Sequence, residues 1–223
     1  MRIVGVLIIT ADDYGYRPAY DRGILEAARA GAVDAVSAMV GEGCVPGPLL
    51  ETGVEIGLHL ELPGGRADPG AALQRQLDAF EELFGRPAAH LDAHHHAHAA
   101  PAERARALAT LASEVGLPVR SVSAGHRALL RACGVVTPDR LIGRLEENEP
   151  LLPREIEVVL AGEGFPQGVT EWMVHPGRMD PGTGSGYDAG REEDLRLLLD
   201  FAGEEAVGEL RATHSEALSD RGR

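Results

Sequence analysis

The chain has 223 residues, of which 44% are hydrophobic and only 4% aromatic, and it carries a net charge of −14 at pH 7. This length suits one domain, residues 1–223, with a core built mainly from Ala, Val, Leu and Ile. The acidic balance excludes the basic face of a nucleic-acid-binding protein or of a protein that docks on an anionic membrane. All 21 basic residues are arginines, so the chain can form neither a lysine Schiff base nor a P-loop with its phosphate-binding lysine.

The first half of the chain alternates between predicted strands and helices. An apolar, β-branched run over residues 3–9 is typical of a buried parallel strand. A helix is predicted from Pro18 to about Ala30, and Gly31 ends it. The next elements are two strands over 33–40 and 53–60 and a helix over 71–84.

The second half continues this alternation. The predicted elements are a short strand over 90–92, a helix over 101–115, a strand over 117–122, a helix over 138–147, a strand over 169–175 and helices over 192–201 and 204–211. We expect the polar tail from about residue 212 to be disordered. The pattern favours a parallel sheet covered by helices, and an open doubly wound sheet and a closed (β/α) barrel both fit it. In either fold, ligands bind at the carboxyl ends of the strands.

The N-terminal apolar run also bears on location. Residues 3–9 are too few to span a bilayer, and they lead into Asp12 and Asp13 without the cleavage site of a signal peptide. We therefore expect a cytoplasmic protein with neither a membrane nor a nucleic-acid partner.

Two adjacent carboxylates follow the first predicted strand, in Thr10-Ala11-Asp12-Asp13-Tyr14-Gly15. Acidic pairs after strands are also common as helix caps and loop residues. Two carboxylates this close can nevertheless divide labour, because one can bind a metal ion while the other takes a proton from water. The turn that follows them would let both side chains face a pocket.

Histidines follow two further strands. His59 lies in the run Gly57-Leu58-His59-Leu60, which ends the predicted strand over 53–60, and the stretch from His90 to His98 holds five histidines and Asp92. A lone histidine is most often structural, and a histidine-rich loop can bind metal adventitiously. At the carboxyl ends of neighbouring strands, however, these residues would converge with the aspartate pair on a divalent-metal site. Asp92 lies two residues before His94, so it could orient that imidazole.

A fourth segment ends the predicted strand over 169–175. Glu171 and His175 are four residues apart, so they lie on the same side of an extended chain. His175 precedes a Pro-Gly turn, a position that suits a general acid beside bound substrate, although a structural histidine is the alternative. The four segments together predict a mononuclear metal hydrolase.

The same four segments resemble the ordered motifs of one family. Thr10 to Gly15 is similar to a small residue followed by Asp-Asp-Phe-Gly, and Gly57 to Leu60 is similar to the second motif. His90 to His98 and Thr170 to Gly177 are similar to the third and fourth motifs. The chain therefore resembles the YdjC-like carbohydrate deacetylase family, which includes chitooligosaccharide deacetylases and a hopanoid-biosynthesis branch.

The resemblance implies an α/β fold of the (β/α) barrel-like type and metal-dependent removal of an N-acetyl group. Because the stretch between His59 and His90 is brief and no final strand is evident near the C-terminus, we expect an incomplete or distorted barrel. A homodimer is a further expectation from the resemblance.

The resemblance also implies roles for individual residues. Asp13, His59 and His94 would hold one divalent ion, Mg or Zn, and Asp12 would be the general base. From its position and chemistry, His175 is the expected general acid. Supporting or substrate-contacting roles are expected for Asp92, His96, His98, Glu171, Arg120 and Tyr14.

The low aromatic content bears on the substrate, because long oligosaccharide grooves usually offer stacking rings. The rings near the predicted site are those of Trp172, Tyr14, Tyr16, Tyr20 and Tyr187. We therefore expect a small acetylated amino sugar or a glycoconjugate head group rather than a polymer. The alternatives are a hydrolase of a different amide or ester on the same scaffold and a non-catalytic metal- or sugar-binding protein.

Overall fold

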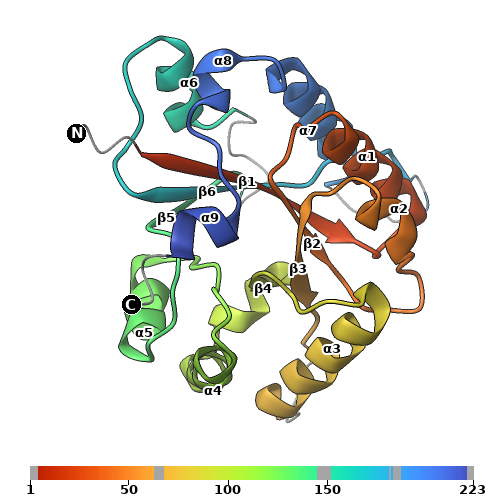
Figure 1. Ribbon diagram of the computed structural model, residues 1–223, viewed down its shortest axis with the longest axis vertical. Helices are drawn as coiled ribbons and strands as arrows, with labels where there is room; N and C mark the ends of the chain where they lie inside the picture. Colours follow the sequence, from red (N-terminus) through yellow and green to blue (C-terminus); the bar gives the residue numbers. More distant parts are fainter. Residues whose placement is uncertain (1–4, 63–67, 145–151, 181, 183–186, 220–223) are drawn as a thin grey trace.

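A computed structural model describes residues 5–62, 68–144, 152–180, 182 and 187–219. Six parallel strands form one sheet in the order β4-β3-β2-β1-β6-β5 (Figure 1). The strands are β1 (Val6–Tyr14), β2 (Ala35–Ala38), β3 (Glu55–Leu60), β4 (Leu91–Ala93), β5 (Arg140–Ile142) and β6 (Val169–Val174). This arrangement confirms the predicted parallel α/β architecture.

Helices cover the outside of the sheet, as Figure 1 shows. The helices of the described residues are α1 (Pro18–Arg29), α2 (Pro46–Leu50), α3 (Pro69–Phe84), the 3-10 helix η1 (His94–Ala99), α4 (Ala102–Val115), α5 (Ala124–Ala132), α6 (Arg154–Leu160), α7 (Asp188–Phe201), α8 (Glu205–Gly208) and α9 (His214–Leu218), of which η1 and α9 lie at the two ends of the half-barrel. Within the described part of the chain, no helix combines the length and apolarity needed to cross a bilayer.

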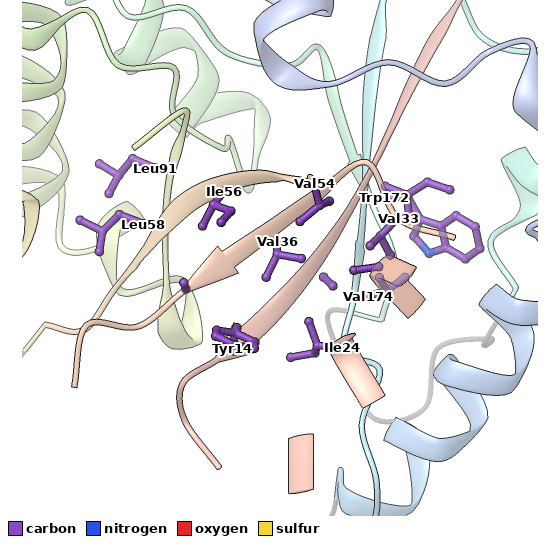
Figure 2. Packing of buried hydrophobic residues seen from close by; sticks show 14 of the residues in the cluster. Tyr14, Ile24, Val33, Val36, Val54, Ile56, Leu58, Leu91, Trp172 and Val174 are labelled. Carbon is purple, nitrogen blue, oxygen red and sulfur yellow. The ribbon is translucent and has the colours of Figure 1, made fainter. Parts of the chain in front are cut away.

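The outer face of the sheet is apolar and packs against these helices. Figure 2 shows Val36, Ile56 and Leu58 in this layer, together with Ile24 of α1. Trp172 of β6 is 1% exposed and packs edge-on against Phe201 of α7, with ring centroids 6.4 Å apart. Burial of this layer stabilises the fold and fixes which side of each strand faces inward.

The inner face of the sheet is polar. Because side chains alternate along a strand, residues of the opposite parity point away from the outer helices. They include Thr10 and Asp12 of β1, Ser37 of β2, His59 of β3, Asp92 of β4 and Glu171 of β6, and all are buried. Arg120 contacts side chains of the neighbouring strands β1 and β6 and also of β4, which is separated from β1 by β2 and β3, so the sheet curls around this guanidinium.

The gap between the edge strands β4 and β5 is crossed by irregular chain. The segment predicted as a strand over 117–122 makes only one bridge to β4, between Leu91 and Val119. The Val119 amide then donates to the carbonyl of Val136, just before β5, over 3.0 Å. The sheet is therefore a curled half-barrel, in agreement with the expected incomplete barrel.

The amino ends of the strands are covered by the C-terminal segment. Leu218 of α9 packs against Ile8 and Val169 in a small apolar cluster separate from the outer layer. Thr213 and Glu216 form a capping box at the start of α9. The expectation of a disordered tail from about residue 212 was therefore wrong for this segment, because α9 buries an apolar side chain at the barrel's open end.

Three further differences concern helices. The helix predicted over 138–147 is wrong over residues 140–142, which form β5 and pair with β6, while residues 145–147 lie outside the described residues. Pairing with a neighbouring strand here overrides local helix propensity. The helix predicted over 204–211 is reduced to α8, and the helices α5 and α6 were not predicted.

Candidate active site and metal centre

Asp12 and Asp13 both face the carboxyl end of the sheet because β1 is irregular at this point. The pairing with β2 shifts register between Ala11 and Tyr14, and Asp13 has a φ of 75°. Adjacent residues of a regular strand would point to opposite faces, whereas a bulge lets two successive side chains share one side. A left-handed φ on a non-glycine residue is costly and is typical of functional sites.

Asp13 lies at the centre of three potential metal ligands. Its Oδ1 is 3.1 Å from Nε2 of His59 and 3.0 Å from Nδ1 of His94. One ligand atom from each residue lies within 4.8 Å of the other two. A carboxylate and two imidazoles fit a divalent ion such as zinc and leave coordination positions open, so these residues pass the chemical test for the expected metal site.

Asp92 orients His59 rather than His94, which corrects the expectation from sequence spacing. His59 and Asp92 are register partners on β3 and β4, and Nδ1 of the imidazole lies 2.7 Å from Oδ1 of the carboxylate. The other carboxylate oxygen accepts a 2.7 Å hydrogen bond from Ser37. Nε2 of His59 is thereby left to face Asp13, as a ligating imidazole requires.

The titration of this cluster also suits metal binding. Burial opposes ionisation of Asp13, but hydrogen bonds from His59 and His94 hold the pKa of this carboxyl well below its usual range. Burial likewise disfavours the charged form of His59, yet Asp92 and Asp13 raise its pKa well above the usual value. The acidic surroundings that retain a proton on this imidazole are those that would favour a divalent cation in its place.

Arg191 of α7 completes the surroundings of Asp13, and the sequence did not predict it. One guanidinium nitrogen lies 2.6 Å from Oδ2 of Asp13, and the guanidinium stacks over the Tyr20 ring with its carbon 3.7 Å from the centroid. Arg191 is 5% exposed. Because it occupies Oδ2, only Oδ1 of the carboxylate is directed at His59 and His94.

The histidine cluster is held in a strained turn. His95 and His96 have φ values of 53° and 54°, inside η1. His94 alone of the cluster contacts Asp13, while His95 is exposed. His98 is buried and its Nε2 donates to the carbonyl oxygen of Arg120 over 2.9 Å. Burial lowers the pKa of His98 to about 3, so it is a neutral structural residue at pH 7.

Arg120 fixes the second carboxylate of the pair. Its two terminal nitrogens lie 2.5 and 2.8 Å from the oxygens of Asp12, a bidentate geometry. Burial disfavours the charged guanidinium, but Asp12, Asp92 and Glu171 raise the pKa of Arg120 well above its usual value. Asp12 is thus a buried carboxylate of defined orientation beside the metal-ligand cluster.

His175 follows β6, which pairs with β1 on the side opposite to β2 and β3. Its Nε2 is 4.0 Å from Oδ2 of Asp12, and its backbone amide donates to Asp194 over 2.8 Å. Burial lowers the pKa of His175 to about 4, so the imidazole is neutral at pH 7. A proton must therefore reach this residue before it can act as a general acid.

The aromatic residues divide into buried and accessible rings. Tyr14 is 1% exposed and its hydroxyl donates to the carbonyl of Val45 over 2.7 Å, so a substrate-contacting role for Tyr14 was wrong. Tyr20 and Trp172 are each 1% exposed as well. Tyr16 is 43% exposed, and its ring centroid is 5.1 Å from that of His94. The ring centroids of Tyr187 and His175 are 5.0 Å apart.

Comparison with known sequences decides the family. The profile of a family described as "YdjC-like protein" matches residues 6–73 and 67–218. The chain belongs to the YdjC-like family. The family resemblance inferred from the four motifs of this YdjC-like chain is therefore confirmed.

Several relatives of this YdjC-like protein are named deacetylases. It is 33% identical over 149 residues to a chitooligosaccharide deacetylase of Serratia marcescens, covering 52% of this chain and 58% of the relative. It is 33% identical over 139 residues to a human carbohydrate deacetylase, covering 43% and 42%. A carbohydrate deacetylase of Vibrio cholerae is 29% identical over 227 residues, covering 86% and 87%. The chain thus spans about half the length of the first two relatives.

A solved structure supports the fold. The crystal structure of a candidate cellobiose-phosphate cleavage protein from Enterococcus faecalis V583 superposes with a TM-score of 0.79 at 23% identity. The superposition covers 96% of this chain and 99% of that protein. This likeness shows that the curled half-barrel is shared by the two proteins.

Proposed function

We propose that this YdjC-like protein is a metal-dependent hydrolase that removes an N-acetyl group from an acetylated amino sugar or glycoconjugate. The proposal rests on one observation, that the two adjacent aspartates have different partners. Asp13 faces two imidazoles at 3.0 and 3.1 Å, while Asp12 is held separately by Arg120. The names of the relatives indicate the reaction to which this arrangement is applied.

Asp13, His59 and His94 would hold the divalent ion. When bound there, the ion would polarise the amide carbonyl and lower the pKa of water. Two imidazoles in the ligand set suit zinc better than magnesium, which prefers oxygen ligands. Arg191 binds Oδ2 of Asp13, so Oδ1 would be the oxygen offered to the ion, and a three-residue ligand set would leave coordination positions for water and the substrate carbonyl.

Asp12 acts as the general base and His175 supplies the proton to the leaving amine. Arg120 orients both oxygens of Asp12 and prevents the carboxylate from turning towards the ion. Because His175 is neutral at pH 7, it receives the proton that Asp12 has taken from water, across a separation of 4.0 Å that a small movement can close. The balance is complete, since one proton leaves the water and one reaches the nitrogen of the amine.

The accessible rings suit a small sugar. Tyr16, beside His94, and Tyr187, beside His175, lie on two sides of the site. Trp172, Tyr14 and Tyr20 are buried, so the site offers stacking for a short substrate rather than for a long polymer. Chitin oligomers should therefore not be turned over faster than the disaccharide.

Acetate release tests the proposal. The protein is stripped of metal, reconstituted with zinc or magnesium, and incubated with diacetylchitobiose and with N-acetylglucosamine conjugates. We expect release only after reconstitution, and about 10²–10⁴-fold slower release by Asp12→Asn with metal content unchanged. Bound metal without acetate release from any conjugate would contradict the deacetylase and favour another amide or ester, or a binding protein.

A further inference from the structure

A chain of buried charged groups connects Asp12 to the C-terminal helix. Arg120, which binds Asp12, also donates from Nε to Oε1 of Glu171 over 2.8 Å. The same Oε1 lies 3.5 Å from Nε2 of His214, the first residue of α9. Asp12, Arg120, Glu171 and His214 are each at most 2% exposed. The general-base candidate at one end of the half-barrel is thus linked to a helix that covers the other end.

His214 is held firmly on its second side. Its Nδ1 lies 3.1 Å from Oε1 of Glu55, and its backbone amide donates to the same oxygen over 2.9 Å. The other oxygen of Glu55 accepts from the amide of Ser215 over 3.0 Å. The ring of His214 stacks on that of His90, with centroids 3.9 Å apart and planes at 17°. Both ring nitrogens therefore face carboxylates.

These contacts keep His214 charged. Burial disfavours the imidazolium, but Glu171 and Glu55 raise the pKa of His214 to about 9. The stacked His90 has its pKa lowered, first by burial and then by the charge of His214. Asp34 also faces this imidazole at longer range, and its own partner is Arg211 at 2.9 Å. At neutral pH the stack is therefore an imidazolium on a neutral imidazole.

Glu55, His90 and His214 also bring three possible metal-ligand atoms together. An ion bound to two imidazoles lies near the plane of each ring. Nearly parallel rings stacked at 3.9 Å cannot both direct a nitrogen at one ion in this way. The geometry favours a proton shared with Glu55 and Glu171 over a second metal ion.

Charge compensation gives a separate argument for the imidazolium. Along the contacting groups described above, the carboxylates are Asp12, Asp13, Asp92, Glu55 and Glu171, and the guanidiniums are Arg120 and Arg191. With the imidazolium, and with His59 neutral as it would be when ligating an ion, these carboxylates exceed the cations by two charges, which is the charge of one divalent ion. Without it, the buried excess would be larger, and uncompensated buried charge is strongly unfavourable.

We propose that His214 is a positioning residue for Asp12: its imidazolium holds Glu171, Glu171 holds Arg120, and Arg120 orients the carboxylate of Asp12. This inference rests on the proposed function, because it assigns His214 to the same reaction. It also gives α9 a role beyond covering the barrel, since the helix delivers a fixed cation to the interior.

Replacement of His214 tests the inference. His214→Gln keeps a hydrogen-bond donor near the Nε2 position but removes the charge. We expect kcat to fall about 10–100-fold, with KM and the metal dissociation constant changed by no more than about twofold. In the unaltered protein, kcat should also decline as pH rises through about 9, where His214 loses its proton, and this decline should be absent in the variant.

Leu218→Ala is the matched control, because it loosens the packing of α9 without changing a charge. We expect this variant to lose stability while retaining most of its kcat and the decline near pH 9. An equal loss of kcat in Leu218→Ala would overturn the positioning role, as would an unchanged kcat and pH profile in His214→Gln.

An activity-independent measurement separates this inference from the proposed function. The ring resonances of His214 are followed by NMR against pH in the full chain and in Glu171→Gln. We expect titration near pH 9 in the former and at clearly lower pH in the latter. Titration near 6.5, or no change in Glu171→Gln, would overturn the charged chain. If the protein releases no acetate, the proposed function is contradicted. The titration still shows independently whether Glu171 keeps His214 charged.

Discussion

His59 and Asp92 are register partners on adjacent strands, and a 2.7 Å contact joins their side chains. Strand pairing therefore fixes the orientation of a metal-ligand imidazole before any ion is bound. The same pairing places Nε2 of His59 3.1 Å from Asp13, on a third strand of the sheet. Two of the three candidate metal ligands, His59 and Asp13, are thus positioned by the strands of the sheet.

Asp92→Asn tests this relationship. An amide cannot support the charged form of His59 or fix its Nδ1–H as well as a carboxylate does, so we expect metal affinity to fall about 10–100-fold. Isothermal titration with zinc on the metal-free protein measures the change. Ser37→Ala, which removes the hydrogen bond to the other oxygen of Asp92 and a 2.9 Å contact with Nε2 of His90 but keeps the carboxylate itself, should have a smaller effect. Equal affinity in Asp92→Asn and the unaltered protein would contradict the orienting role.

Gly57 explains part of the motif around His59. A Cβ at this position would lie 2.3–2.4 Å from three atoms of the His90 ring. Gly57→Ala should therefore displace His90 from its stack on His214 and lower the free energy of unfolding by about 1–3 kcal/mol. Gly41→Ala is the control, since a Cβ there meets no atom within 4 Å. Urea unfolding of both variants measures the difference, and equal stabilities would show that the close approach of His90 is unimportant.

Arg191 pairs with Asp13 in a buried environment, so its removal should be costly. Arg191→Met leaves the carboxylate without its 2.6 Å partner, and we expect a loss of roughly 3–5 kcal/mol in the free energy of unfolding of the metal-free protein. Arg191→Lys should lose less, because it keeps the charge. Bound zinc should reduce the loss in Arg191→Met, since the ion compensates the same carboxylate. A loss that is unchanged by zinc would show that Arg191 and the metal site are independent.

Acid stability should depend on Glu171. Burial opposes ionisation of this carboxyl, but Arg120 and His214 lower its pKa from 4.5 to about 2. The unfolded state therefore binds more protons than the folded state between these values, so the contribution is present above about pH 4.5 and is lost as pH falls towards 2. Denaturant unfolding across this range should show a shallower decline in Glu171→Gln. Parallel pH profiles of the two proteins would contradict the lowered pKa.

The local motifs made much of the site predictable. Asp12, Asp13 and His59 lie near the carboxyl ends of their strands and His94 directly follows β4, and the carboxyl ends of parallel strands meet at one edge of the sheet. Their proximity could therefore be inferred without a three-dimensional structure. The orienting role of Asp92 was assigned to the wrong histidine, because spacing along the chain does not reveal which residues pair across strands.

Other parts of the site could not be predicted because they depend on distant contacts. Arg191 reaches Asp13 from a helix 178 positions later in the chain, and His214 lies in a tail whose polar composition suggested disorder. The β5 strand was predicted as a helix, since only its pairing with β6 determines its conformation. Tyr14 follows the aspartate pair, yet the bulge in β1 sends its side chain into the core.

The location of the metal ion is the most direct test of the proposed metal site. Crystals of the zinc-loaded protein, measured on both sides of the zinc absorption edge, would give the position of the ion by anomalous scattering. We predict one strong peak about 2.0–2.2 Å from Oδ1 of Asp13, Nε2 of His59 and Nδ1 of His94. A peak between Glu55, His90 and His214, or no peak at the aspartate pair under saturating zinc, would contradict this prediction.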